Sequence, residues 1–437
     1  MRARTPGSAA HVLPLKLIVA EPDRVKAGAR KKHIECDVDR IVALDGERKD
    51  VVTRLDGLRA ESKQAGKKIA HASAEERPAL VAAQSEQKKE LKALEARSKE
   101  IDEEIRELLL LVPNIPAAEV PEGATDEDNL EIKRWGKPRA FDFEPRSHID
   151  LGNAHGWLDI ERGARLSGSR NYVLRGDLAL LEHAVMRFAF DSMVARGFTP
   201  LSVPTLVRRE TMVGTGYFPG GEDQAYRCDE RDDLCLVGTA EVPVTALHQD
   251  EILEAADLPM KFVAQSTCYR REAGTYGKDT KGLYRVHQFQ KVEQVVIDVA
   301  DEDRSLAHHE AILGNSEALL QALDLPYRVV NVCGGDLGQP QVQKFDIETW
   351  MPSRESFGET HSASRFHDFQ ARRLSLRYRD EEGKVHHCHT LNNTVAASTR
   401  MLIALLENHQ NADGTVTLPE VLRRFFGGRE VIGAPVF

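Results

Sequence analysis

The sequence has no long apolar run. Its longest strongly apolar stretch, from Leu108 to Val112, is far shorter than the roughly 20 residues that a bilayer-spanning helix needs. Near the N-terminus, Pro6, Gly7 and Lys16 interrupt what would have to be the apolar core of a secretory signal. We therefore expect no membrane segment and a protein that stays in the cytoplasm.

Cysteine is scarce, and no two cysteines form a C-x-x-C pair, which speaks against a disulfide framework and against a zinc ribbon. The stretch His386-His-Cys-His389 comes closest to a metal-binding pattern, but adjacent residues of a strand point to opposite faces and no second ligand pair lies at a usual spacing. We expect reduced thiols and no zinc. The cysteines are Cys36, Cys228, Cys235, Cys268, Cys333 and Cys388.

A basic charge balance is absent too, because the formal net charge is -10 at pH 7. Sequence-independent affinity for nucleic acids comes from the neutralisation of phosphates by Lys and Arg. The composition therefore argues against indiscriminate nucleic-acid binding, and any contact with RNA must be local. The chain of 437 residues, 41% of them hydrophobic, predicts a soluble protein with roughly two or three domains.

Residues 37–111 have no proline except Pro78 and few aromatic residues, and they predict a helical arm. Two helices joined around His71 to Arg77, with Ser73 capping the second, would form an antiparallel hairpin about 50 Å long. The alternative interpretations of such a pair are a bundle domain and a dimerisation coil. Heptad spacing is seen in Leu91, Leu94, Ser98, Ile101, Ile105, Leu108 and Val112, and more weakly in Ile41, Leu44, Arg48, Val51, Leu55, Leu58, Ser62, Ala65 and Ile69.

We expect the chain to have four parts. Residues 1–14 are expected to be a disordered extension and residues 15–112 an N-terminal domain that carries the arm. Residues 113–131, rich in Pro, Glu and Asp, predict a linker, and residues 132–437 a mixed α+β domain. In that domain Leu178, Leu181, Val185 and Phe188 keep helical spacing, Gly197 can end the helix, and Phe198 to Pro204 predicts an extended run.

The segment Cys268-Tyr-Arg-Arg-Glu272, a loop at 273–281 and the run from Gly282 to Glu293 predict an antiparallel hairpin that binds a nucleotide. On alternate residues of one strand, Arg270 and Glu272 would point to the same face. One cation and one acceptor would then address one ligand.

This hairpin resembles motif 2 of class II aminoacyl-tRNA synthetases, and specifically of the bacterial seryl-tRNA synthetase family. The resemblance runs from Leu15 to Glu420. It includes the flanks of the arm at 15–26 and 111–116, a motif 1 unit at 178–204 and a motif 3 candidate at 389–410. It implies an α+β fold, a class II antiparallel sheet flanked by helices, with an N-terminal antiparallel two-helix coiled-coil arm.

The resemblance also implies the chemistry of ATP-dependent amino-acid activation. Arg270 would hold the α-phosphate and the incoming carboxylate, and Arg400 the γ-phosphate, because planar guanidinium groups bind phosphate in a fixed geometry. Glu272 would accept from the adenine amino group and Phe289 would stack on the purine. Glu359 would coordinate Mg²⁺. The expected ATP site also contains Arg271, Thr360, His361 and Ser362.

Two segments depart from the family pattern. Glu359-Thr-His-Ser362 replaces Glu-Ile-Ser-Ser, and Ala363-Ser-Arg365 replaces Cys-Ser-Asn. In motif 3, Asn392-Asn-Thr394 replaces Asn-Gly-Ser, and Ala and Thr replace the glycines before Arg400. Loss of glycine matters where the backbone needs positive φ or a ligand approaches closely. We expect the turn to survive, because Ala and Thr are small and compatible with a helix.

Selectivity for serine requires buried polar partners for a small hydroxyl. Glu293 and Thr394 match the side-chain pocket of the family. Thr239, Ala240 and Glu241 match its loop over the amino group of the substrate.

The implied function is that of a homodimeric ligase that activates L-serine with ATP and transfers it to the 3′ end of tRNA(Ser), and of tRNA(Sec) where present. The arm would contact tRNA by shape and backbone, through Arg59, Lys63, Lys67 and Lys68, whose alternative interpretation is a solvated helix face. Three other readings stay open: a specialised paralogue for resistance or biosynthesis, a carrier-protein amino-acid ligase, and a catalytically silent interaction protein. The complete arm speaks against the second, and the phosphate-binding arginines speak against the third.

Overall fold

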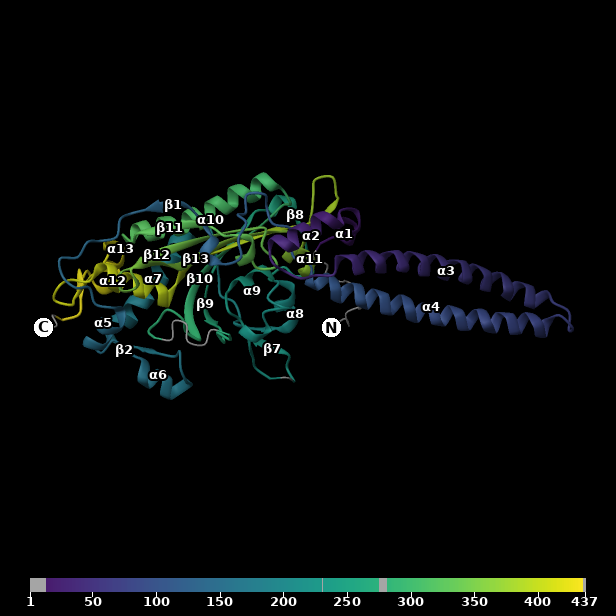
Figure 1. Cartoon of the computed structure of the whole chain (residues 1–437), viewed down its shortest axis with the longest axis horizontal. Coiled ribbons are helices and arrows are strands. Elements are labelled where there is room, and N and C mark those ends of the chain that lie inside the picture. Colours follow the sequence, from purple (N-terminus) through teal and green to yellow (C-terminus); the bar gives the residue numbers. More distant parts are fainter. Residues whose placement is uncertain (1–12, 230, 275–280, 435–437) are drawn as a thin grey trace. The chain divides into compact units, whose positions relative to one another are not determined.

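The computed structural model describes residues 13–229, 231–274 and 281–434 (Figure 1). Most of the predicted N-terminal extension and the middle of the predicted loop at 273–281 lie outside these residues. The chain forms two compact units, Met1–Ile115 and Pro116–Phe437. No helix in the described part of the chain is long and apolar enough to cross a membrane.

The first unit contains the predicted arm. Helices α1 (Leu15–Ala20) and α2 (Pro22–Lys31) pack against α3 (Val38–His71), which forms a long antiparallel pair with α4 (Arg77–Leu111) (Figure 1). The Asp37 side chain caps α3 by accepting from the backbone N–H of Arg40 at 2.9 Å. At the tip, Ser73 and Glu76 each accept a hydrogen bond from the other's backbone N–H, at 3.3 and 3.2 Å. This reciprocal pair has the hydrogen bonds of a capping box, but it lies in the turn before α4, whose N-cap residue is Glu76 and accepts no side-chain cap bond, so Ser73 is not the N-cap that the sequence predicted.

The predicted heptad positions far from the tip of the arm are mostly buried, whereas those nearer the tip, such as Ile69, Leu91 and Leu94, are only partly buried. Ile41, Leu44 and Leu58 of α3 are buried as expected. In α4 the buried position near the exit is Leu109 rather than Leu108, which is half-buried. Ion pairs between the helices flank the seam, among them Arg40–Glu104, Arg54–Glu90 and Arg97–Glu47.

An eight-stranded sheet forms the framework of the second unit. Neighbouring strands are antiparallel except β4, which runs parallel to β9. This confirms the expected class II arrangement of an antiparallel sheet. In spatial order the strands are β1 (Leu130–Trp135), β11 (Tyr327–Asn331), β12 (Gln343–Met351), β13 (Ser356–His367), β16 (His389–Ala397), β10 (Gln288–Asp298), β9 (Met260–Tyr269) and β4 (Thr199–Leu201).

Alternation along the central strands separates two hydrophobic clusters. Val263 and Val296 belong to the cluster that contains helices α7 (Gly176–Ala195), α10 (Glu302–Ala322) and α12 (Ser398–His409). Phe262 and Val295 belong to the cluster that contains α9 (Glu241–Thr245) and α11 (Phe369–Leu374). Because side chains of adjacent strand residues point to opposite faces, these helices cover the two faces of the sheet.

Smaller elements complete the second unit. The helix predicted from the 178–188 spacing is α7, and Gly197, with φ of 83°, follows its end. The other elements are α5 (His148–Ala154), β2 (Leu158–Asp159), α6 (Ile160–Ser167), β3 (Val173–Leu174), β5 (Leu206–Arg208), α8 (Arg209–Gly214), β6 (Tyr226–Arg227), β7 (Leu234–Leu236), β8 (Ile252–Glu254), β14 (Arg377–Arg379), β15 (Val385–His387), β17 (Val416–Thr417), α13 (Glu420–Arg423) and β18 (Val431–Ile432).

The segment predicted as a linker differs from that expectation. Val120 is 3% exposed and packs with Val330 and Val332. The backbone N–H of Ala117 donates to the Val342 carbonyl at 2.9 Å, and strand β1 already begins at Leu130. The second unit therefore starts near residue 116, because backbone hydrogen bonds tie this proline-rich segment to the sheet.

Candidate functional site

The site residues of strands β9 and β10 lie on one face of the sheet. Phe289, Lys291 and Glu293 alternate along β10 on the same face as Val295, and Phe289 pairs with Cys268 of β9. Arg270 directly follows β9 and keeps its backbone bond to this hairpin, from its N–H to the His287 carbonyl at 2.9 Å. Its guanidinium carbon lies 5.3 Å from the centroid of the Phe289 ring.

The prediction that Arg270 and Glu272 occupy alternate positions of one strand is wrong. Strand β9 ends at Tyr269, and Glu272 has a φ of 52°, which turns the backbone out of the extended conformation. Both side chains nevertheless line one cavity of about 410 Å³. The Glu272 carboxylate accepts from the Arg285 guanidinium at 2.9 Å. The sequence analysis did not identify Arg285. Its partner is Glu272, and the contact depends on the backbone turn at Glu272.

A second cation reaches the same cavity from helix α12. Strand β16 leads directly into α12, as predicted for motif 3, and Arg400 lies in the first turn of the helix. Its guanidinium donates to the Glu359 carbonyl at 2.6 Å and lies 3.3 Å from the Glu359 carboxylate. It also lies over the ring of Tyr284, 4.6 Å from the centroid.

Glu359 is ionised in this surrounding. Burial alone would raise the pKa of its carboxyl group, but the positive charges of Arg400, Lys344 and Arg270 outweigh burial and lower the pKa below the ordinary value. The side chain itself is 49% exposed, so we take its carboxylate as accessible from the cavity that it lines with Thr360 and Thr394.

A bulge in β13 separates the side chains of the altered segment at 359–362. Glu359 pairs with Glu348 and His361 with Ile347, so Thr360 is an extra residue between them. Thr360 thus shares the cavity of Glu359. His361 is buried, and one ring nitrogen lies 3.0 Å from the Val395 carbonyl. Burial lowers its pKa to about 4, which leaves the ring neutral.

The residues predicted for the serine pocket lie close to one another, and Thr394 lines one cavity with Arg270 and Arg400. Glu293 and Thr394 are cross-strand partners in β10 and β16. The Thr239 hydroxyl donates to the Glu293 carboxylate at 3.4 Å, and Glu293 also forms an ion pair with Lys291. Ala240 precedes α9 and is fully buried. Lys291 was not singled out from the sequence, although its position two residues before Glu293 places both on one strand face.

Glu241 is the most completely bonded carboxylate of this group. One of its oxygens accepts from the Tyr217 hydroxyl and the other from the Gln370 amide, each at 2.8 Å. Burial, followed by the negative charge of Glu293, raises the pKa of Glu241. Tyr217 and Gln370 are 24 and 129 residues away in sequence, so no local pattern could have identified them.

Two histidines of the stretch 386–389 lie close to other protein side chains. A ring nitrogen of His386 lies 2.7 Å from the Asp380 carboxylate, and one of His389 lies 2.7 Å from the Ser305 hydroxyl. Across the residues that the structure describes, no group of three His, Cys, Asp or Glu side chains could hold a metal ion.

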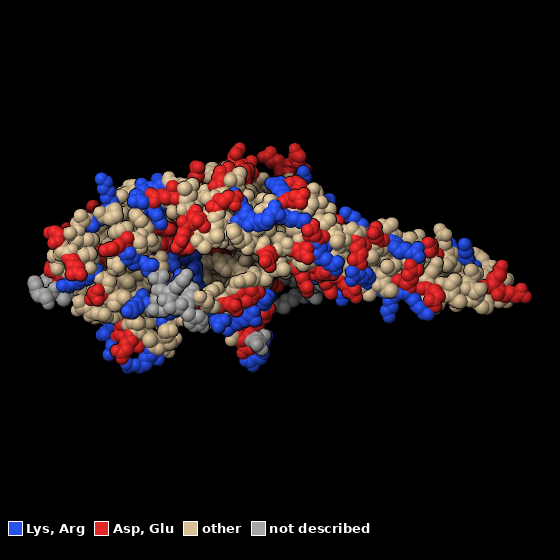
Figure 2. Space-filling view, in the orientation of Figure 1, with Lys and Arg blue, Asp and Glu red and all other residues tan. Residues whose placement is uncertain are grey.

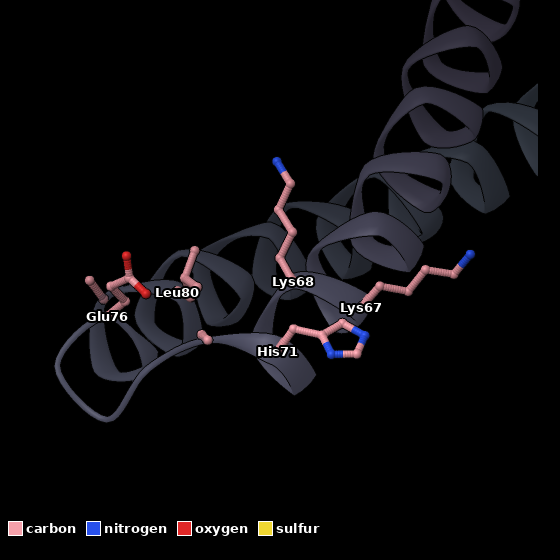
Figure 3. Close-up of a pocket in the computed structure, with 7 residues that line it drawn as sticks. Lys67, Lys68, His71, Glu76 and Leu80 are labelled. Atoms are coloured by element: carbon pink, nitrogen blue, oxygen red, sulfur yellow. The ribbon is translucent and has the colours of Figure 1, made fainter.

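Two of the basic residues predicted on the arm, Lys67 and Lys68, lie near its tip. Lys67, Lys68 and His71 line a hollow of about 620 Å³ with Glu76 and Leu80. The two lysine side chains extend away from one another into solvent (Figure 3). Arg59 differs from them, since it is held in an ion pair with Glu95 at 3.0 Å. Along the rest of the arm, positive and negative side chains are interspersed (Figure 2).

Comparison with known proteins agrees with this geometry. Residues 226–409 match the family model of the tRNA synthetase class II core domain (G, H, P, S and T). The antiparallel sheet, with arginines of a strand end and of a following helix around one cavity, thus defines a class II aminoacyl-tRNA synthetase. Residues 12–116 match the seryl-tRNA synthetase N-terminal domain.

Full-length relatives narrow the assignment. The chain is 48% identical to a serine–tRNA ligase of Deinococcus radiodurans, over 97% of this chain and all of the relative. It is 44% identical to that of Fervidobacterium nodosum, over 95% of this chain and 98% of the relative. The crystal structure of seryl-tRNA synthetase from Pyrococcus horikoshii complexed with ATP superposes with a TM-score of 0.90 at 38% identity, covering 97% of this chain and all of that one. The chain belongs to the seryl-tRNA synthetase family, which confirms the resemblance predicted from the sequence.

Proposed function

We propose that this protein activates L-serine with ATP and transfers the seryl group to the terminal ribose of tRNA(Ser), and of tRNA(Sec) where present. The observation that carries the proposal is that Glu293 is buried, accepts from Thr239 and pairs across the sheet with Thr394, which lines one cavity with Arg270. A small hydroxyl and an α-ammonium group suit these partners, because carboxylates accept and hydroxyl groups both donate and accept.

The activation step needs fixed cations more than reactive groups. An oxygen of the serine carboxylate attacks the α-phosphorus of ATP, the bond from that phosphorus to the bridging oxygen breaks, and pyrophosphate leaves with both electrons. Arg270 would hold the attacking carboxylate and the α-phosphate, and Arg400 the γ-phosphate. Preorganised cations that face the developing charge stabilise such a transition state.

The adenine would stack on the aromatic ring of Phe289, with Glu272 accepting from its amino group. Glu272 is oriented for this by Arg285, and Arg271, which is exposed, lies between Arg270 and Glu272. Thr360 lines the adjoining cavity. His361 and Ser362 follow it on β13 and would help to hold this part of the cavity in place.

The site fits one Mg²⁺ ion. Glu359 offers an ionised, accessible carboxylate, and the hydroxyl of Ser362 follows on the same strand. Mg²⁺ commonly binds through one or two carboxylates together with substrate phosphates and water, so a set of three protein ligands is not required. When bound, the ion would neutralise charge on the phosphates. No zinc enters this proposal.

Two features extend beyond the adenylate site. The arm, through Lys63, Lys67 and Lys68, would contact the tRNA backbone, since RNA helices are recognised mostly by shape and phosphate contacts. Helix α7 and strand β4 form the motif 1 unit, which in the family builds the homodimer interface. We propose the same dimer here, and a cytoplasmic location.

Pyrophosphate exchange with a panel of amino acids, followed by charging of tRNA(Ser), tests the proposal. Serine-dependent exchange together with charging supports it. Exchange without charging of tRNA(Ser) would favour the specialised paralogue, and exchange that depends on another amino acid would refute the serine assignment.

A further inference from the structure

A continuous chain of hydrogen bonds surrounds Glu241 and reaches three other elements. The Tyr217 hydroxyl, in the loop after α8, donates to one carboxylate oxygen at 2.8 Å. The Gln370 amide, on α11, donates to the other at 2.8 Å. The Thr390 hydroxyl, on β16, donates to the Gln370 amide oxygen at 2.6 Å. Gln370 and Thr390 are fully buried.

The chemistry of the partners fixes the orientation of the Gln370 amide. Its nitrogen faces two acceptors, the Glu241 carboxylate and the Thr215 carbonyl at 3.1 Å. An ionised carboxylate cannot donate, so only the NH₂ group satisfies both. The amide oxygen then accepts from the Thr390 hydroxyl, and this bond fixes the orientation of the amide.

We propose that Tyr217, Gln370 and Thr390 are positioning residues that hold the Glu241 carboxylate oriented for the α-ammonium group of serine. Each carboxylate oxygen accepts one bond from this network and retains a further lone pair. Tyr217 also lines the cavity that contains Arg270. An amino acid there would place its ammonium group at Glu241 and its carboxylate at Arg270. This inference rests on the proposed function and specifies how that site binds its substrate.

Serine binding requires Glu241 to be ionised, and the network favours that form. Burial and the charge of Glu293 raise the pKa of Glu241, whereas the hydrogen bonds from Tyr217 and Gln370 and the charge of Lys291 lower it. Removal of the Tyr217 hydroxyl therefore moves the acid limb of kcat/KM for serine to higher pH. A change that merely loosened the fold would not move this limb in a fixed direction.

The test uses full-length enzyme in serine-dependent pyrophosphate exchange. Tyr217→Phe should raise KM for serine about tenfold or more, the range for a hydrogen bond to a charged group, and leave KM for ATP within about twofold. Tyr378→Phe is the matched control, because that buried hydroxyl accepts from the backbone N–H of Ala300. Its KM for serine should stay at the wild-type value.

A second pair of variants changes Thr390, which contacts Gln370 rather than Glu241 itself. Thr390→Val removes the hydroxyl that locks Gln370 and should raise KM for serine several-fold. Thr390→Ser keeps a hydroxyl and should restore the wild-type value.

The inference is overturned if Tyr217→Phe and Thr390→Val bind serine as the controls do, or if KM for ATP rises in parallel with KM for serine. These outcomes require an active wild type. A wild type with no serine-dependent exchange would overturn the proposed function itself, and this inference with it.

Discussion

Substitution of Arg270 best separates an effect on catalysis from an effect on folding. Within the described part of the chain, no carboxylate lies within ion-pair distance of its guanidinium, whereas Arg400 pairs with Glu359 and Arg285 with Glu272. The side-chain contact that the structure gives Arg270 is the face of Phe289. An incoming phosphate or carboxylate would therefore meet a cation whose charge is not already neutralised.

In Arg270→Ala, the expected loss of folding stability is much smaller than the expected loss of transition-state stabilisation. A cation–π contact at a partly exposed site contributes about 0.5–1 kcal/mol, and the backbone bonds of Arg270 to His287 survive in Arg270→Ala. The melting temperature should thus fall by less than about 4 °C. Loss of a charge-assisted clamp on the transition state costs at least about 3 kcal/mol, or more than a hundredfold in rate.

The assay is pyrophosphate exchange at saturating serine and ATP, with thermal unfolding of the same preparations. Arg270→Lys should recover little activity, because the ammonium group keeps the charge but lacks the planar fork. Arg231→Ala serves as a control, since Arg231 is 87% exposed and paired with Asp229. Exchange by Arg270→Ala within threefold of the wild type would refute the role of Arg270, and a large fall in melting temperature would show that its role is structural.

Three further predictions concern the arm, the pocket and the buried histidines. Replacing residues 37–111 by a short linker should preserve serine-dependent exchange and abolish tRNA charging; equal loss of both would show that the arm supports the catalytic unit. Wild type should reject alanine by about 10⁴-fold in kcat/KM, because alanine leaves buried polar groups unpaired, and Thr394→Ser, by removing a methyl group, should lower the serine-to-threonine ratio; an unchanged ratio would refute the steric argument. Burial lowers the pKa of His309 to about 4, so its contribution to stability is present above about pH 6.5 and is lost as pH falls toward 4, by up to about 3 kcal/mol. In denaturant unfolding at about pH 7 and about pH 4.5, His309→Gln should lose less stability on acidification than the wild type does; an equal loss would contradict the assignment.

Local patterns explain which parts of the fold could be predicted. Heptad spacing depends only on residues three and four apart, so the sequence predicts the arm and its buried Ile41, Leu44 and Leu58. The same holds for α7, whereas the passage from β16 into α12 was expected from the family resemblance. The linker prediction failed for the opposite reason, since Val120 is buried by Val330 and Val332, which lie some two hundred residues later in the chain.

The sequence names a set of candidate site residues, but it does not supply their geometry. Spacing by two placed Arg270 and Glu272 on one strand face, yet β9 ends at Tyr269, before both residues, and Glu272 has a positive φ. The alternation rule holds where the strand continues, as for Phe289 and Glu293, and it fails at the bulge of Thr360. Partners of the charged groups, such as Arg285 for Glu272, depend on turns whose φ angles no spacing rule supplies.

The glycine replacements before Arg400 show how a sequence departure acts on the site. Glycine is favoured where φ is positive, yet no residue from Thr394 to Arg400 has positive φ, and Ala397 is extended, with φ of -110°. The turn therefore forms without glycine, as expected. The added atoms instead enter the cavity, which Thr394, Ala397 and Thr399 all line beside Arg400. These substitutions change the volume and polarity available to the ligand, and Arg400 still lies in the first turn of α12. We therefore expect their effect in KM and in substrate discrimination rather than in stability.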